Sequence, residues 1–116
     1  PFEAHAVERL LAEHTDCVID FGAGHSVYED TALFARVQRA LAPYPHVVLL
    51  LPSPDLDESV RILADRNREL PNDIRQTNEH FVRHPSNAKL AKFTVYTKGK
   101  TPEETRDEIL QWVRSR

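Results

Sequence analysis

The chain has 116 residues and a net charge of −3, with 41% hydrophobic and 28% charged side chains. This composition is typical of one globular domain, and no apolar run approaches the roughly 20 residues of a membrane span. The single cysteine, Cys17, excludes an intrachain disulfide framework, so we expect a reducing, cytoplasmic location and no membrane partner.

Charge is distributed unevenly along the sequence. Residues 1–65 carry 4 basic and 11 acidic side chains, a net charge of −7, whereas residues 66–100 carry 8 basic and 3 acidic side chains, a net charge of +5. A basic segment in an otherwise acidic chain indicates a local site for an anion rather than a nucleic-acid surface. A solvated charged face fits the same pattern.

Helix and strand patterns alternate in the first half of the chain. Apolar residues recur at helical spacing over 3–14, and a short apolar, β-branched run over 17–21 predicts a buried strand. Asp30 fits the N-cap of a helix that ends before Pro43. Residues 46–51 are apolar on both faces, which is typical of an interior parallel strand.

The second half continues this alternation. The dipeptide Ser53-Pro54 predicts a helix with proline at its first position. The polar stretch over 66–78 predicts a mobile loop, and a short helix over 85–91 and a strand over 93–96 follow. A capping box over 101–104 predicts the start of the last helix.

This order of elements predicts a single α/β domain over residues 1–116, with a parallel sheet and helical crossovers. Three recognisable strands make a narrow sheet for such a domain. The strand over 46–51 is apolar enough to need a neighbour on each edge. We therefore expect a further strand before residue 1 in a longer parent protein, and self-association through the incomplete sheet.

The first candidate site is the turn that ends the strand over 17–21. Asp20, Gly22 and Gly24 would lie beyond the carboxyl end of a parallel strand, where ligands bind in open α/β sheets. A carboxylate there can hold Mg²⁺ or its water, and glycines let the backbone approach a ligand. The alternative is an ordinary strand-to-helix turn. The P-loop signature G-x-x-x-x-G-K-[ST] and the nucleophile elbow G-x-S-x-G occur nowhere in the chain.

The second candidate site is a series of arginines. Arg66, Arg68 and Arg75 lie in the polar stretch, and Arg83 follows it. Phosphoryl transfer spreads negative charge over the moving group, and planar guanidinium groups on a closing loop can stabilise that charge. The alternative is a solvated loop whose arginines face water.

A histidine pair is the third feature considered. His80 and His84 are spaced i, i+4 and would share one face of a helix, as two zinc ligands do. Pro85 follows at once, and neither a cysteine nor a third histidine lies at metal-ligand spacing. We therefore expect no metal site here. A hydrolase triad around Ser26 is not expected either, because near neighbours in sequence seldom present triad geometry.

Four segments stand in a fixed order along most of the chain: Val18–Gly24, Val47–Leu56, Arg83–Ala91 and Thr97–Glu104. In order and spacing they resemble the shikimate kinase family of P-loop kinases. The resemblance implies a three-layer P-loop kinase-like sheet, of which this chain lacks the first strand, the P-loop and the second strand. The turn reads Gly-Ala-Gly where the family has three glycines, and the Arg83 segment lacks the family's tyrosine, so the acceptor stays open.

The resemblance implies roles for seven residues. Asp20 and Arg75 would be catalytic, Asp20 by positioning Mg²⁺ through water and Arg75 by facing the transferred phosphate. The others would hold the two substrates: the acceptor by Gly22, Gly24 and Arg83, and the adenine by Arg66 and Pro102. Residues 66–92 would form the lid and the acceptor-binding segment.

The resemblance also implies an activity. A full-length parent would use ATP and Mg²⁺ to phosphorylate a hydroxyl group of a small anionic metabolite, and this chain alone, without a P-loop, would be inactive. A second hypothesis is a non-catalytic anion-binding or assembly module with the same fold, acting through Arg75 and Arg83. A third is an unrelated flavodoxin-like regulatory domain. None of the three involves nucleic acid.

Overall fold

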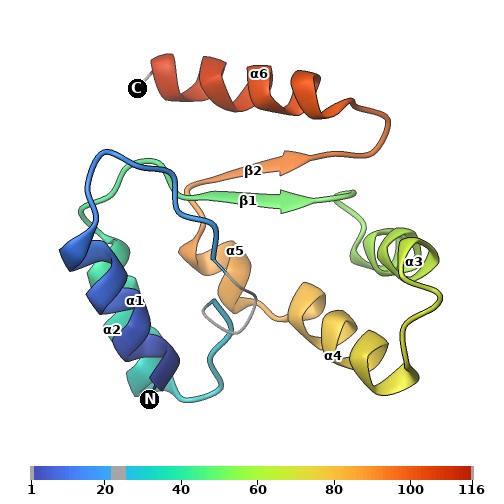
Figure 1. Cartoon of the computed structure of the whole chain (residues 1–116), viewed down its shortest axis with the longest axis horizontal. Coiled ribbons are helices and arrows are strands. Elements are labelled where there is room, and N and C mark those ends of the chain that lie inside the picture. Colours follow the sequence, from blue (N-terminus) through green and yellow to red (C-terminus); the bar gives the residue numbers. More distant parts are fainter. Residues whose placement is uncertain (1, 22–25, 116) are drawn as a thin grey trace.

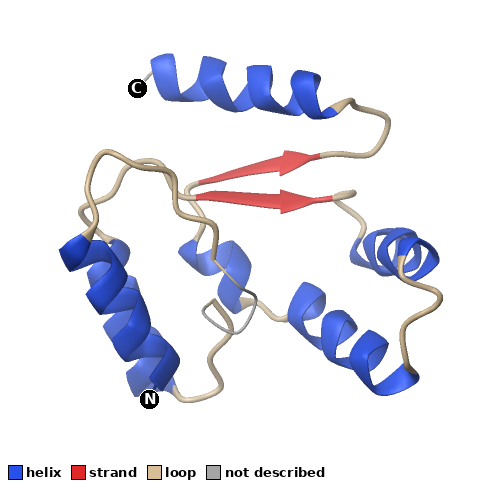
Figure 2. Cartoon of the chain, viewed as in Figure 1, coloured by secondary structure: helices blue, strands red, loops and turns tan. Residues whose placement is uncertain are grey.

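Six helices and two strands make up the part of the chain that the computed structural model describes, residues 2–21 and 26–115 (Figures 1 and 2). The helices are α1 (Phe2–Glu13), α2 (Thr31–Leu41), α3 (Leu56–Arg66), α4 (Asn72–Arg83), α5 (Ser86–Leu90) and α6 (Pro102–Arg114). The strands are β1 (Val48–Leu51) and β2 (Phe93–Tyr96). None of the described helices is long and apolar enough to cross a membrane.

The strands β1 and β2 pair in parallel, with Val48 opposite Phe93 and Leu51 opposite Tyr96. The chain passes from one to the other through α3, α4 and α5, which gives the mixed helix and strand unit that the alternation predicts. The strand over 93–96 is confirmed, and the one over 46–51 forms from Val48 onward. Both strands point toward α3 and toward the loop that leads to α6, so their carboxyl ends lie there (Figure 1).

Helix α6 packs against β2 through aromatic rings. Trp112 stacks on Phe93 with ring centroids 4.7 Å apart, and His46 meets the same indole edge-on at 5.4 Å. The predicted capping box is confirmed, since the side chain of Thr101 accepts from the Glu104 N–H at 3.1 Å and Glu104 Oε1 accepts from the Thr101 N–H at 2.9 Å.

The main apolar cluster lies away from the sheet, where α1 and α2 run side by side next to α5 (Figure 1). Its buried members are Ala4, Val7, Tyr28, Val37, Leu41 and Leu90. Arg36 on α2 binds both carboxylate oxygens of Glu8 on α1, at 2.8 and 2.6 Å. Lys92 at the start of β2 donates to the carbonyl groups of Leu41 and Ala42, so the C-terminus of α2 is fastened to the sheet.

The strand predicted over 17–21 is wrong. These residues form an irregular segment, in which Cys17 is exposed and Val18 is 99% exposed. An apolar, β-branched run becomes a strand only when a neighbour pairs with its backbone N–H and C=O groups. Among the described residues, the sheet contains β1 and β2 alone rather than three strands.

The loop predicted over 66–78 is also wrong, because most of it is helical. Helix α4 begins at Asn72, directly after Pro71. Proline lacks an N–H group, which has no cost at a helix N-terminus, so Pro71 marks the beginning of a helix rather than a break. Helix α3 starts at Leu56, later than Ser53-Pro54 predicts, because the N-cap is Asp55, whose side chain accepts two backbone N–H groups.

Replacing Thr101 with alanine tests the cap of α6. We expect the free energy of unfolding to fall by about 1 kcal/mol, the usual cost of a lost N-cap hydrogen bond. Chemical denaturation followed by circular dichroism measures the change. Thr31→Ala is the matched control, because Thr31 is exposed and makes no side-chain hydrogen bond within the described residues. An equal loss in the control would contradict the capping role.

Candidate functional site

The predicted glycine turn lies at the edge of the described structure. Asp20 is exposed in the irregular segment that leads into the turn, and Gly22 and Gly24 lie outside the described residues. In residues 2–21 and 26–115, no group of three or more histidine, cysteine, aspartate or glutamate side chains is arranged to hold a metal ion. The roles of Asp20, Gly22 and Gly24 therefore stay predictions.

The residues that follow the glycine turn dock onto the junction of α4 and α5. The Ser26 hydroxyl donates to Asn87 Oδ1 at 2.7 Å, and the Tyr28 N–H donates to Ser86 Oγ at 3.4 Å. These contacts join positions that are 61 and 58 residues apart in the sequence. The flank of the glycine turn and the segment after Arg83, both predicted on the acceptor side, are therefore neighbours.

Glu29 belongs to this junction, although no sequence pattern pairs it with α4. Its Oε1 atom lies 3.2 Å from His80 Nε2 and 3.1 Å from His84 Nε2. The Ser86 N–H donates to His84 Nδ1 at 3.1 Å, so Nε2 is the nitrogen of a neutral His84 that carries the proton and donates to Glu29. The two histidines lie near each other as their spacing predicts, and both face a single carboxylate.

Arg83, predicted to hold the acceptor's carboxylate, already has two carboxylate partners. Its Nη1 lies 2.8 Å from Asp57 on α3, and its Nε lies 2.9 Å from Glu79 one turn earlier on α4. These hydrogen bonds, first from Asp57 and then from Glu79, raise the pKa of the guanidinium above its ordinary value. An anionic acceptor at Arg83 would have to displace one of them.

Arg66 and Pro102, predicted on either side of the adenine, stand at a helix end and a helix start. Arg66 is the last residue of α3 and Pro102 is the first of α6, and both are exposed. The loop before α6 is fastened nearby through Lys98. Its backbone N–H donates to Pro52 O at 2.9 Å, and its Nζ lies 2.9 Å from Glu58 on α3. This loop therefore lies at the carboxyl end of β1.

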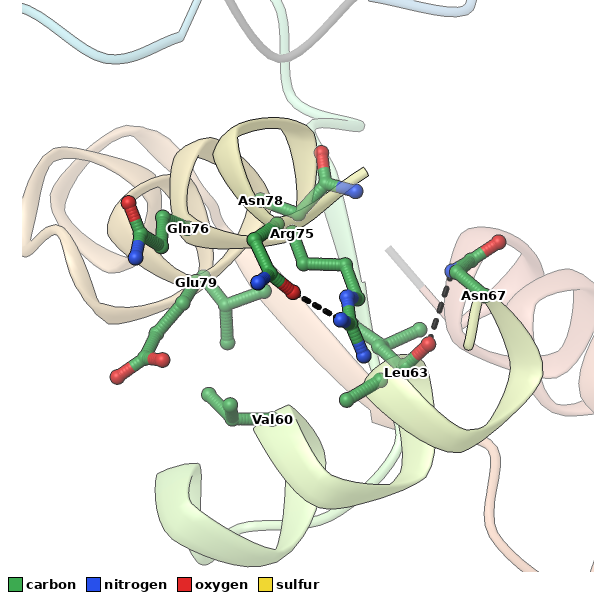
Figure 3. A pocket seen from close by; sticks show the side chains of 10 residues that line it. Val60, Leu63, Asn67, Arg75, Gln76, Asn78 and Glu79 are labelled. Atoms are coloured by element: carbon green, nitrogen blue, oxygen red, sulfur yellow. Dashed lines mark hydrogen bonds between the residues drawn. The ribbon is translucent and has the colours of Figure 1, made fainter. Parts of the chain in front are cut away.

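A hollow of about 270 Å³ lies between α3 and α4 (Figure 3). Arg75 extends from α4 toward α3, near Leu63 and Asn67 (Figure 3). Its Nη2 donates to Asn72 Oδ1, and its Nε is buried without a hydrogen-bond partner among the described residues. Arg75 is thus a predicted site residue that faces a cavity, and it does so from helix α4 rather than from the predicted loop.

No protein-family model matches the sequence, and comparison with curated proteins and with solved structures found no match. The structure itself provides a mixed helix and strand fold with parallel β1 and β2. The kinase-like topology and the activity remain proposals that depend on the motifs and on the geometry of the described residues.

Replacing Glu58 with glutamine tests the link between α3 and the loop before α6. Lys98, and then Ser53, hold the pKa of the Glu58 carboxyl below its ordinary value of 4.5 through hydrogen bonds. A lowered pKa in the folded state gives stability that is present above pH 4.5 and is lost as the pH falls through the folded value. The free energy of unfolding should therefore fall less steeply with acid in Glu58→Gln than in the wild type.

Denaturant titrations between about pH 6 and about pH 3 measure this difference. Glu69→Gln is the control, because Glu69 is exposed and forms no ion pair within the described residues. An acid response of Glu58→Gln as steep as that of the wild type would show that the Lys98 contact does not stabilise the fold.

Proposed function

We propose that this chain is the acceptor-binding and lid part of a larger ATP-dependent kinase, which phosphorylates a hydroxyl group of a small metabolite. The incomplete sheet is the observation that supports this proposal most directly. Among the described residues, β1 has a parallel partner on one edge only, and the apolar segment over 17–21 pairs with no strand. The resemblance implies the sheet order 2-3-1-4-5, in which the missing first strand, which leads into the P-loop, lies between the segment over 17–21 and β1.

The composition of β1 supports a further strand on its open edge. All four residues of the strand are aliphatic, and Leu50 is 53% exposed. Natural edge strands are usually shielded by charges, prolines or bulges, none of which occurs within Val48–Leu51. β1 therefore has the character of an interior strand, which fits the middle position that the kinase topology assigns to it.

The described residues fit a phosphoryl group at Arg75 better than an acceptor carboxylate at Arg83. Arg75 is half-buried and has no carboxylate partner among them, whereas Arg83 is held by Asp57 and Glu79. We assign to Arg75 the stabilisation of charge on the transferred group. Bound Mg²⁺ would neutralise charge on the nucleotide phosphates, and the exposed Asp20 would help to position it.

A non-catalytic anion-binding module is the second candidate function. The hollow at Arg75 supports it, because the lining comes from α3, α4 and the residues between them and needs no P-loop. The engaged guanidinium of Arg83 removes one of the two arginines first considered for such a module. The two candidates therefore differ in whether the parent contains a nucleotide-binding loop.

The coding sequence and the longer protein test the kinase proposal. We expect the reading frame to continue upstream of residue 1 through an apolar strand and a G-x-x-x-x-G-K-[ST] loop. In the presence of Mg²⁺, the longer protein should convert ATP to ADP when it is assayed with a panel of small hydroxyl compounds. Arg75→Ala should lower its kcat roughly 100-fold, because a charge-stabilising donor is lost.

Arg39→Ala is the matched control, since Arg39 is exposed on α2 and forms no ion pair within the described residues. Its kcat should equal that of the wild type. A reading frame that opens at residue 1, or a longer protein without a P-loop, would contradict the kinase proposal and favour the binding module.

A further inference from the structure

The two half-buried arginines of the described chain differ in their partners. Arg36 and Arg75 are half-buried, and the other described arginines are exposed. Arg36 is neutralised by Glu8, which accepts from its Nε and Nη2. Arg75 has the neutral carboxamide of Asn72 instead, and its buried Nε has no partner among the described residues. A partly buried charge without a counter-ion is unfavourable, because its desolvation is not offset.

The hollow beside Arg75 has room for an anion, which would offset this cost of desolvation. Its apolar wall includes Val60 and Leu63 from α3 and Val82 from α4, and carboxamide groups of α4 and of Asn67, the C-cap of α3, line much of the rest. Glu79 also lines the hollow, but its carboxylate points away from the Arg75 guanidinium and pairs with Arg83 at 2.9 Å (Figure 3). The hollow therefore combines hydrogen-bond donors and one uncompensated positive charge with an apolar wall.

We infer that the hollow between α3 and α4 binds a small oxyanion, a carboxylate or a phosphate monoester, through Arg75. The oxyanion accepts from the Arg75 guanidinium, and the carbon part of the ligand packs on Val60, Leu63 and Val82. At about 270 Å³ the hollow is smaller than the roughly 300–1,000 Å³ of pockets for drug-sized ligands, so it suits a small metabolite rather than a nucleotide. This inference goes beyond the kinase proposal, because it requires neither a nucleotide nor a P-loop.

Titration of the chain with two probes tests the inference. Inorganic phosphate and propionate are added separately at constant ionic strength, and backbone amide shifts are followed by NMR. We expect saturable shifts in α3 and α4 with at least one probe, and an affinity at least tenfold lower in Arg75→Gln. Arg39→Gln, which changes an exposed arginine of α2 outside the hollow, should bind like the wild type.

The two probes also separate the possible sources of the oxyanion. Saturation by phosphate alone assigns the hollow to phosphate monoesters, and saturation by propionate alone assigns it to carboxylates. Saturation by neither probe, or equal affinity in Arg75→Gln, would overturn the inference.

Thermal unfolding provides a second readout that does not depend on ligand choice. In buffer without oxyanions, Arg75→Gln should raise the melting temperature, because an uncompensated charge is removed from the α3–α4 interface. A lower melting temperature would mean that Arg75 is a structural residue and would overturn the inference. A failure of this inference can be told apart from a failure of the kinase proposal. The kinase proposal is tested by the upstream P-loop and not by this titration.

Discussion

Parallel pairing of β1 with β2 determines the path of the chain through α3, α4 and α5. Parallel strands cannot be joined by a tight turn. The chain must therefore leave the carboxyl end of β1 and return to the amino end of β2, at the opposite end of the pair. Backbone bonds extend the pairing at both ends, from Phe93 N–H to Val47 O at 3.1 Å and from Thr97 N–H to Leu51 O at 2.9 Å. The return path through α3, α4 and α5 contains the hollow, the arginines and the junction with residues 26–30.

Elements fixed by local chemistry are predictable from the sequence, and elements that depend on distant partners are not. Helix α2 begins where Asp30 accepts the N–H groups of Ala32 and Leu33, and the capping box of Thr101 starts α6. The run over 17–21 has the residue types of a strand, yet it stays irregular because strand formation needs a neighbour. Pro71 has the residue type of a helix breaker, and only its position relative to α4 makes it a helix start.

The candidate site likewise contains local contacts, which the sequence predicts, and contacts between distant residues, which it does not. The pair of Arg83 with Glu79 is a local i, i+4 contact that the sequence can provide, whereas Asp57 reaches Arg83 only because α3 and α4 pack together. The same packing creates the hollow that Arg75 faces, so a motif can indicate this arginine but not its surroundings. Glu29 contacts two histidines far away in the sequence, and no spacing rule connects them.

Helix α4 has no buried residue, and this gives the molecule two parts that respond differently to salt. Its attachments include the ion pair between Arg83 and Asp57, and such exposed charges are screened as ionic strength rises. The apolar cluster between α1 and α2 is not weakened in this way, although the ion pair of Arg36 with Glu8 that joins the same helices is screened too. Concentrated salt should therefore weaken the attachment of α4 to α3 while the apolar cluster of α1 and α2 stays packed.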